Sequence, residues 1–173
     1  MLNKRLSLLG ISNIDYLNFK SAATVYVITP THTRLTQKAD LTRLSQTLLH
    51  IPKLHWIVVE DAAEKTVLVE RFLKGCGLSY THLAIKTSKH LIRGEDEPRW
   101  LKARGVEQRN LGLQWLRKHF DTVTMKGVVY FADDDNTYNI KLFEQVNNNV
   151  IDYDYCTVLH WEPGSNQQIT KFF

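Results

Sequence analysis

The sequence predicts an α/β fold in which an open, mostly parallel sheet carries helices on its faces. Runs rich in β-branched and aromatic residues, at 24–29, 54–59 and 127–132, are typical of strands buried on both faces. Segments with helical spacing of apolar residues lie between them. Strands that alternate with helices form βαβ units, and these bring successive strands together in parallel.

The first βα unit is the clearest. Pro30 is expected to stop the first strand, and Leu41, Leu44 and Leu48 then follow at spacings of three and four, which is typical of the apolar face of a helix. We expect Pro52 to end this helix. The opposite, solvent-facing side of the helix is predicted to carry Lys38, Asp40, Arg43 and Gln46.

The remaining elements follow in the same alternation. After the strand at 54–59 we predict a helix at 64–74 ending at Gly75 and Gly77, a short strand at 79–85, a polar loop at 86–103, a helix at 105–120, the strand at 127–132, a helix at 138–146 and one more strand within 149–159. The predicted organisation is a lead-in at 1–23, an α/β domain at 24–146 and a tail at 147–173.

Composition and charge narrow the function. The chain has 173 residues, of which 43% are hydrophobic and 23% charged, so it has ordinary globular composition. Its net charge of +4 comes without a compact basic run, so we predict no nucleic-acid partner. Cys76 and Cys156 are far apart and form no zinc motif. Because no apolar run is long enough to span a bilayer, the chain as written is expected to be soluble.

Three consecutive aspartates, Asp133–Asp135, are the sharpest functional signal. They follow the strand at 127–132, and the carboxyl ends of strands are where open α/β sheets bind ligands. Adjacent carboxylates repel one another unless a cation or hydrogen-bond donors neutralise them, and such oxygen ligands suit Mg²⁺ or Mn²⁺ together with phosphate. The alternative is a polar loop in which one aspartate caps the next helix. The position favours a metal–phosphate site.

Other candidates follow the other strands. Asp61 comes after the second strand, but the spacing Asp61–Glu64 also fits a capping box for the next helix. His32 follows the first strand and alone would be an exposed loop histidine. Arg104 and Arg109 straddle a predicted helix start, where they would favour an anion or simply be solvated. Together these residues describe a nucleotide-diphosphate site with a divalent metal, and neither a Walker A loop nor a GxGxxG turn is present.

Four segments resemble one family in their order along the chain. The segments 27–34, 54–62, 104–110 and 128–138 are similar to those of the β-1,3-glucuronosyltransferases, and the similarity covers about residues 24–146. The resemblance implies a GT-A-like fold, UDP-glucuronate as donor, Mn²⁺ as cofactor and inversion at the anomeric carbon. It also implies a galactose-terminated glycan as acceptor, in proteoglycan or glycoprotein synthesis at the Golgi membrane.

The resemblance assigns site residues by position. Pro30, Thr31 and His32 would line the uridine, Asp61 would bond to the uracil, Arg104 and Arg109 would steady the UDP, Asp133 and Asp134 would contact uridine and ribose, and Asp135 would bind Mn²⁺. The position of His32 is typically a tyrosine in the family. Because imidazole has a smaller face for stacking on uracil, we expect weaker donor binding.

The tail departs from the family. From about residue 147 no resemblance remains, although family members continue into an acceptor-binding half that supplies a general base. Neither Glu144 nor Glu162 is assigned that role, and the catalytic base stays unknown. We therefore expect a chain truncated after the donor half, either a glucuronosyltransferase polypeptide or an inactive module that binds UDP and Mn²⁺. Pairing with a second copy or with a full-length relative is an open alternative.

Overall fold

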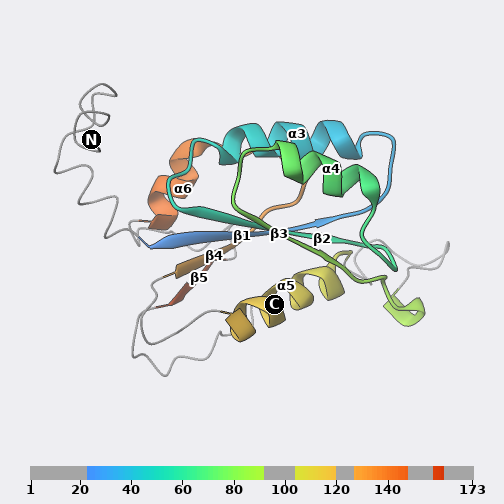
Figure 1. Ribbon diagram of the computed structural model, residues 1–173. Coiled ribbons are helices and arrows are strands. Elements are labelled where there is room, and N and C mark those ends of the chain that lie inside the picture. Colours follow the sequence, from blue (N-terminus) through green and yellow to red (C-terminus); the bar gives the residue numbers. More distant parts are fainter. Residues whose placement is uncertain (1–22, 92–103, 120–126, 148–157, 162–173) are drawn as a thin grey trace.

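The computed structural model describes residues 23–91, 104–119, 127–147 and 158–161. Within these residues a five-stranded sheet has the strand order β3-β2-β1-β4-β5 (Figure 1). The strands are β1 (Thr24–Thr31), β2 (Leu54–Glu60), β3 (Tyr80–Ala84), β4 (Gly127–Phe131) and β5 (Val158–Trp161). The helices are α3 (Gln37–Leu48), α4 (Val67–Gly75), the short 3₁₀ helix η1 (Lys89–Leu91), α5 (Val106–His119) and α6 (Ile140–Asn147).

The predicted parallel sheet is confirmed. β1 pairs in parallel with both β2 and β4, β2 pairs in parallel with β3, and only the edge strand β5 runs antiparallel, beside β4. The parallel strands therefore end at one common edge of the sheet, on the right in Figure 1. This is the edge where open α/β sheets place their ligands.

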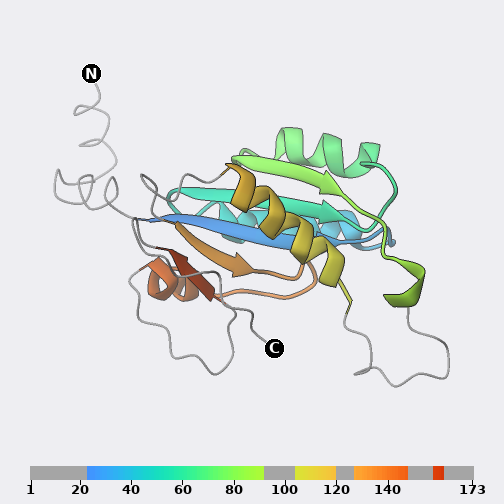
Figure 2. The same ribbon diagram turned by 90° about the horizontal axis from the view of Figure 1, so that it is seen from below.

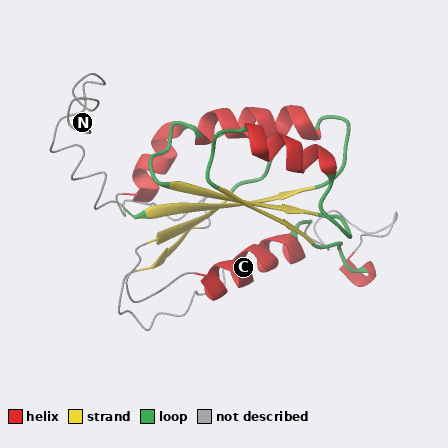
Figure 3. Ribbon diagram, in the orientation of Figure 1, coloured by secondary structure: helices red, strands yellow, loops and turns green. Residues whose placement is uncertain are grey.

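Helices cover both faces of the sheet. Helices α3, α4 and α6 lie on one face and α5 lies on the other (Figures 1 and 3). Alternate residues of β1 follow this division, because Val25 and Val27 belong to the core under α3 and α4, whereas Tyr26 and Ile28 pack with α5. Helix α5 approaches closely at Gly112, where a Cβ atom would meet Ile28 at 2.8 Å. Burial on both faces explains the continuous apolar runs.

Pro30 does not end the first strand as predicted. Strand β1 continues to Thr31, and Pro30 pairs in register with Val59 of β2. The carbonyl of Ile28 accepts a hydrogen bond from the amide of Ala132, so the main-chain groups of Ile28 face β4. Every second residue of a strand faces the same neighbour, and the main chain of Pro30 therefore faces β4 as well. Strand β4 has already ended at Phe131. The sheet therefore loses no hydrogen bond between β1 and β4 although Pro30 has no N–H to donate.

The structure excludes the alternative of a capping box at Asp61–Glu64. Helix α4 begins at Val67, and Thr66 is its N-cap, whose hydroxyl accepts a hydrogen bond from the amide of Val69. The Thr66 hydroxyl and amide both donate to the buried carboxylate of Glu60, at 2.6 and 2.8 Å. His82 on β3 also bonds to this carboxylate, at 2.7 Å. Asp61 is left available to the loop after β3.

The predicted solvent-facing position of Asp40 is also wrong. Its residue is only 9% exposed, and its carboxylate pairs with Arg34 and Arg43. The helical spacing was correct, and Leu41, Leu44 and Leu48 are buried as expected. The error arose because a periodic pattern identifies the apolar face but does not show that Asp40 meets Arg34 of the preceding loop and Arg43 of its own helix.

Several predictions fall outside the described residues. They are the lead-in up to residue 22, the loop at 92–103, Phe120, Cys156 and the tail after β5, while β5 overlaps the end of the strand predicted within 149–159. Figure 2 shows the described elements from below, with β5 at the sheet edge beside β4. No helix in the described ranges is both long and apolar enough to cross a lipid bilayer.

Candidate functional site

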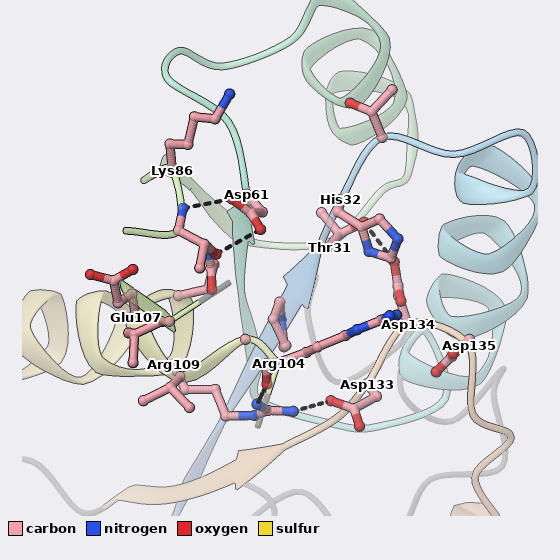
Figure 4. A pocket seen from close by; sticks show the side chains of 17 residues that line it. Thr31, His32, Asp61, Lys86, Arg104, Glu107, Arg109, Asp133, Asp134 and Asp135 are labelled. Atoms are coloured by element: carbon pink, nitrogen blue, oxygen red, sulfur yellow. Dashed lines mark hydrogen bonds and ion pairs between the residues drawn. The ribbon is translucent and has the colours of Figure 1, made fainter. Parts of the chain in front are cut away.

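A pocket of about 830 Å³ lies along the carboxyl edge of the sheet (Figure 4). The chain segments around it come from the ends of β1, β2, β3 and β4 and from the start of α5. All nine residues that the sequence suggests for UDP line it, namely Pro30, Thr31, His32, Asp61, Arg104, Arg109, Asp133, Asp134 and Asp135. The structure thus brings them together, and their roles toward UDP stay predictions.

Asp134 is the buried member of the aspartate triplet. It is 5% exposed, and each of its carboxylate oxygens has a partner. Thr31 donates its hydroxyl to Oδ2 at 2.5 Å, and Arg34 pairs with Oδ1 at 2.9 Å. Burial works against the charge of Arg34, but hydrogen bonds and attraction to Asp134 and Asp40 outweigh it and raise the Arg34 pKa. Asp134 therefore anchors the triplet to the end of β1.

Asp133 is paired with an arginine at the pocket wall. Arg109 of α5 donates to the Asp133 carboxylate through Nη2 and to the main-chain carbonyl of Arg104 through Nη1 (Figure 4). The Tyr138 hydroxyl donates to the Asp133 carbonyl at 3.2 Å. Burial raises the pKa of Tyr138, so its hydroxyl stays protonated as a donor. These contacts join α5 to the loop after β4.

Asp135 differs from its two neighbours. It is exposed on the pocket, and among the described residues its carboxylate has no hydrogen bond or ion pair. Its main-chain carbonyl accepts a hydrogen bond from Arg43 of α3 at 2.8 Å. A hydrogen bond thus fixes the backbone of Asp135, while its carboxylate, which has no partner among the described residues, is available to bind a ligand.

The opposite wall is built by two carboxylates that hold the segment Thr87–Ser88, here called the strap. Asp61 accepts from the amide and the hydroxyl of Thr87, both at 2.7 Å. Glu107 of α5 accepts from the amide and the hydroxyl of Ser88, both at 2.6 Å. The hydrogen bonds from Ser88 lower the pKa of Glu107, because they favour its ionised form.

Gln108 ties the strap to helix α5. Its side-chain Nε2 donates to the Ile85 carbonyl at 3.0 Å and to the Thr87 hydroxyl at 3.1 Å. Its Oε1 is buried and has no hydrogen-bond partner within the described residues. An unpaired buried acceptor is costly, and its place on the pocket lining makes it a candidate for contact with a water or a ligand donor.

Gly105 sets the distance between β1 and α5. Its φ of +74° lies in the left-handed region, and a Cβ atom there would meet Arg109 Nη1 at 2.9 Å and Pro30 at 3.0 Å. Helix α5 begins at the next residue, so Arg104 and Arg109 do straddle its start as predicted. Only glycine fits this turn without displacing a pocket residue.

Sequence reasoning missed Arg34, Thr87 and Glu107. Arg34 stands within the first recognisable segment, two residues after His32, and its position there was the available signal. Thr87 and Glu107 gave none, because the strap contacts join segments 26 and 19 residues apart in sequence. Such pairs depend on the loop geometry.

The residues present fit a divalent cation that is shared with a phosphate ligand. No group of three or more His, Cys, Asp or Glu side chains in the described part of the chain could hold an ion by itself. Mn²⁺ and Mg²⁺ at phosphate-binding sites commonly use one or two carboxylates and complete their shells with phosphate oxygens and water. The unused carboxylate of Asp135 suits that arrangement.

Comparisons with known proteins bear on the fold and the family. Galactosylgalactosylxylosylprotein 3-beta-glucuronosyltransferase 1 of Rattus norvegicus is 53% identical over 126 residues, which are 71% of this chain and 37% of that protein. Galactosylgalactosylxylosylprotein 3-beta-glucuronosyltransferase 3 of Mus musculus is 52% identical over 132 residues, which are 71% of this chain and 39% of that protein. The chain thus spans less than two fifths of the length of these relatives.

Among solved structures, S. aureus TarS 1-349 is similar with a TM-score of 0.44 and 19% identity, covering 70% of this chain and 30% of that one. This structural likeness is too weak to support an argument about function. The family profile described as Glycosyltransferase family 43 matches residues 44–150, which is more than half of the chain. The chain therefore belongs to glycosyltransferase family 43.

Proposed function

We propose that this chain carries the donor-binding half of a β-1,3-glucuronosyltransferase and holds UDP-glucuronate together with Mn²⁺. One observation carries the proposal. Of the three aspartates at the carboxyl edge of the sheet, two are paired with arginines, and only Asp135 presents a carboxylate without a partner among the described residues. The names of the similar proteins, which specify 3-beta-glucuronosyl transfer, support the choice of donor.

In this proposal different residues of the pocket contact the uridine and the diphosphate of the nucleotide. Pro30, Thr31 and His32 line the uridine, while Asp61, fixed by the strap, accepts a hydrogen bond from the uracil through its remaining lone pairs. Arg104 and Arg109 at the start of α5 face the diphosphate, where the helix N-terminus also favours an anion.

The aspartate triplet completes the donor site. Asp133 and Asp134 are proposed to lie along the uridine and ribose, and Asp135 is proposed to hold the metal. When bound, Mn²⁺ supplies Lewis-acid stabilisation of the charge that develops on the departing UDP. The cation is also attracted because Asp135 has no arginine partner for its carboxylate within the described residues.

The acceptor step is proposed on the family alone. Transfer to the terminal galactose of a glycan, with inversion, needs a general base that takes the proton of the acceptor hydroxyl. Five carboxylates line the described pocket, and Asp61, Glu107, Asp133 and Asp134 already hold partners. We therefore place the base outside these residues, in the part of the protein that corresponds to the rest of its longer relatives. Work at the Golgi membrane belongs to the same proposal.

A second candidate is a module that binds UDP and Mn²⁺ without catalysing transfer. It is favoured by the described pocket, where Asp61, Glu107, Asp133 and Asp134 already hold partners and Asp135 is assigned to the metal, so no lining carboxylate is left as a general base. Incubation of the chain with labelled UDP-glucuronate, Mn²⁺ and a galactose-terminated acceptor separates the two. Labelled product supports the transferase, and donor binding without product supports the module.

The donor site itself is tested by calorimetric titration of UDP into the 173-residue chain, with and without Mn²⁺. We expect Mn²⁺ to raise UDP affinity at least about tenfold, which corresponds to about 1.4 kcal/mol. Asp135→Asn should lose this gain, because an amide is a poor ligand for a hard cation.

Glu70→Gln is the matched control, since it removes an exposed carboxylate paired with Lys74 on the outer side of α4. It should keep the full gain in UDP affinity. Equal affinity with and without Mn²⁺ in the unsubstituted chain, or an undiminished gain in Asp135→Asn, would refute the proposed site.

A further inference from the structure

We propose that Asp40, in the first turn of α3, is a positioning residue that fixes Asp135 for the metal by holding two arginines. The inference rests on the proposed function, because it concerns the same metal carboxylate. Asp40 lies 95 residues before Asp135 in the sequence and does not line the pocket, so it acts only through other side chains.

The Asp40 carboxylate is shared between the two arginines. Its Oδ2 accepts from Arg34, at 2.8 Å from Nη2 and 3.2 Å from Nε. Its Oδ1 accepts from Arg43 Nη2 at 3.1 Å. With both oxygens occupied and only 13% of its side chain exposed, Asp40 holds these two guanidiniums at a fixed separation.

Each arginine in turn holds one residue of the triplet. Arg34 Nη2 reaches the carboxylate of Asp134 at 2.9 Å. Arg43 Nη2, the same atom that binds Asp40, donates to the main-chain carbonyl of Asp135 at 2.8 Å. Asp40 therefore stabilises two consecutive residues of the triplet, one through its side chain and one through its backbone.

Asp40 also keeps Arg43 from competing for the metal carboxylate. The Arg43 side chain is 46% exposed and lies against the backbone of Asp135. Without Asp40, the exposed guanidinium loses its anionic partner, and Asp135, whose backbone it already contacts, offers an unused carboxylate. An arginine paired with Asp135 would displace a cation from it.

The local charge points in the same direction. The cluster contains four carboxylates and three guanidiniums, namely Asp40, Asp133, Asp134, Asp135, Arg34, Arg43 and Arg109. Its formal charge is −1, and replacing Asp40 by an uncharged residue makes it zero, which weakens the attraction for a divalent cation. A test must therefore separate charge from position.

Arg43→Gln makes that separation. It removes a positive charge, so a purely electrostatic effect predicts tighter binding of Mn²⁺. It also removes the hydrogen bond to the Asp135 carbonyl, so the positioning role predicts weaker binding. Because Arg43 is about half exposed, the substitution is expected to leave the folded core intact.

The experiment is calorimetric titration of UDP, with and without Mn²⁺, into the full chain and its variants. We expect Asp40→Asn and Arg43→Gln each to reduce the Mn²⁺-dependent gain in UDP affinity about tenfold, relative to the unsubstituted chain. UDP affinity without metal should change less than about twofold. Asp40→Glu, which keeps the charge and both acceptors, should restore most of the gain, and Glu70→Gln should leave it unchanged.

A spectroscopic measurement keeps the inference separate from the proposed function. The carbonyl ¹³C resonance of Asp135, measured by NMR without metal or nucleotide, should shift in both Asp40→Asn and Arg43→Gln because its hydrogen bond is lost. If the unsubstituted chain shows no effect of Mn²⁺, the proposed function fails and this resonance alone decides the positioning role. An unmoved resonance in Asp40→Asn, or tighter metal-dependent binding in Arg43→Gln, would overturn the inference.

Discussion

The two walls of the pocket use carboxylates in opposite ways. On the strap wall, Asp61 and Glu107 bind neutral amides and hydroxyls of Thr87 and Ser88, so their charge is spent on holding a loop. On the triplet wall, arginines neutralise Asp133 and Asp134. The carboxylate left without a described partner, that of Asp135, is on this second wall.

The difference separates shape from reactivity. Hydrogen bonds from Thr87 to Asp61 and from Ser88 to Glu107 fix the loop, which gives the strap wall its form. Arginine pairing cancels most of the repulsion within the triplet and leaves one negative group for a cation. Changes on the strap wall should therefore affect the loop and the pocket geometry, whereas metal binding should respond to changes on the triplet wall.

The largest effect is expected at the buried aspartate. Asp134→Ala removes the carboxylate that accepts from Thr31 and pairs with Arg34, and Arg34 keeps only Asp40 as an anionic partner. The free energy of unfolding should therefore fall by about 3 kcal/mol. Urea denaturation followed by circular dichroism measures this change. Glu70→Ala, at an exposed pair, should have little effect. An unfolding midpoint for Asp134→Ala equal to that of the control would contradict the anchoring role.

A smaller loss is expected on the strap wall. Thr87→Val removes the hydroxyl that donates to Asp61 and accepts from Gln108, and the free energy of unfolding should fall by about 1–2 kcal/mol. Thr42→Val removes an exposed hydroxyl that bonds only within α3, and serves as the matched control. Equal stability of the two variants in urea would show that the strap is held without this hydroxyl.

The exposed pair on the triplet wall should matter little for stability. Arg109→Lys keeps the charge but cannot bind the Asp133 carboxylate and the Arg104 carbonyl together. Because the Asp133 side chain is 44% exposed, the loss should be about 0.5 kcal/mol. UDP binding, measured by calorimetry, should weaken more than stability does. A variant that binds UDP as tightly as the unsubstituted chain would remove Arg109 from the donor site.

The smallest expected effect is on the loss of stability at low pH. The pKa of Glu107 is lowered in the folded state by the Ser88 hydroxyl and amide, so its contribution to stability is present above its ordinary pKa of 4.5 and is lost as the pH falls through the folded value. Thermal unfolding measured between pH 6 and pH 3 should therefore show a shallower acid decline in Glu107→Gln. Parallel declines in both proteins would exclude this linkage.

The sequence predicted the fold well because its signals were local. Hydrophobic runs and helical spacing located the parallel strands and the helices, and the resemblance in four segments named nine residues that line one pocket. The expectations for Pro30 and for the exposure of Asp40 were wrong, and the capping-box alternative at Asp61 is excluded, because each outcome depends on a partner elsewhere in the chain. A spacing rule cannot show that a neighbouring strand has already ended or that a distant threonine has taken up a carboxylate.

The residues that line the pocket could be named from the sequence, but their arrangement could not, and their roles toward UDP stay predictions. Three consecutive aspartates were recognisable as a unit, yet their sequence gives them equal status. The structure distinguishes them by which arginines reach them, and those arginines come from α3, α5 and the loop after β1. The separate states of Asp134 and Asp135 therefore become visible only when the elements are packed.

The turn at Gly105 has a wider consequence. Pro30 and Arg109 are proposed to touch different parts of the donor, and a Cβ atom at residue 105 would lie 3.0 Å from Pro30 and 2.9 Å from Arg109 Nη1. A methyl group at residue 105 would force the Arg109 guanidinium and the Pro30 ring to shift, and it would strain a backbone whose φ is +74°. The space left for a nucleotide between Pro30 and Arg109 therefore depends on Gly105, a residue that has no side chain with which to touch the ligand.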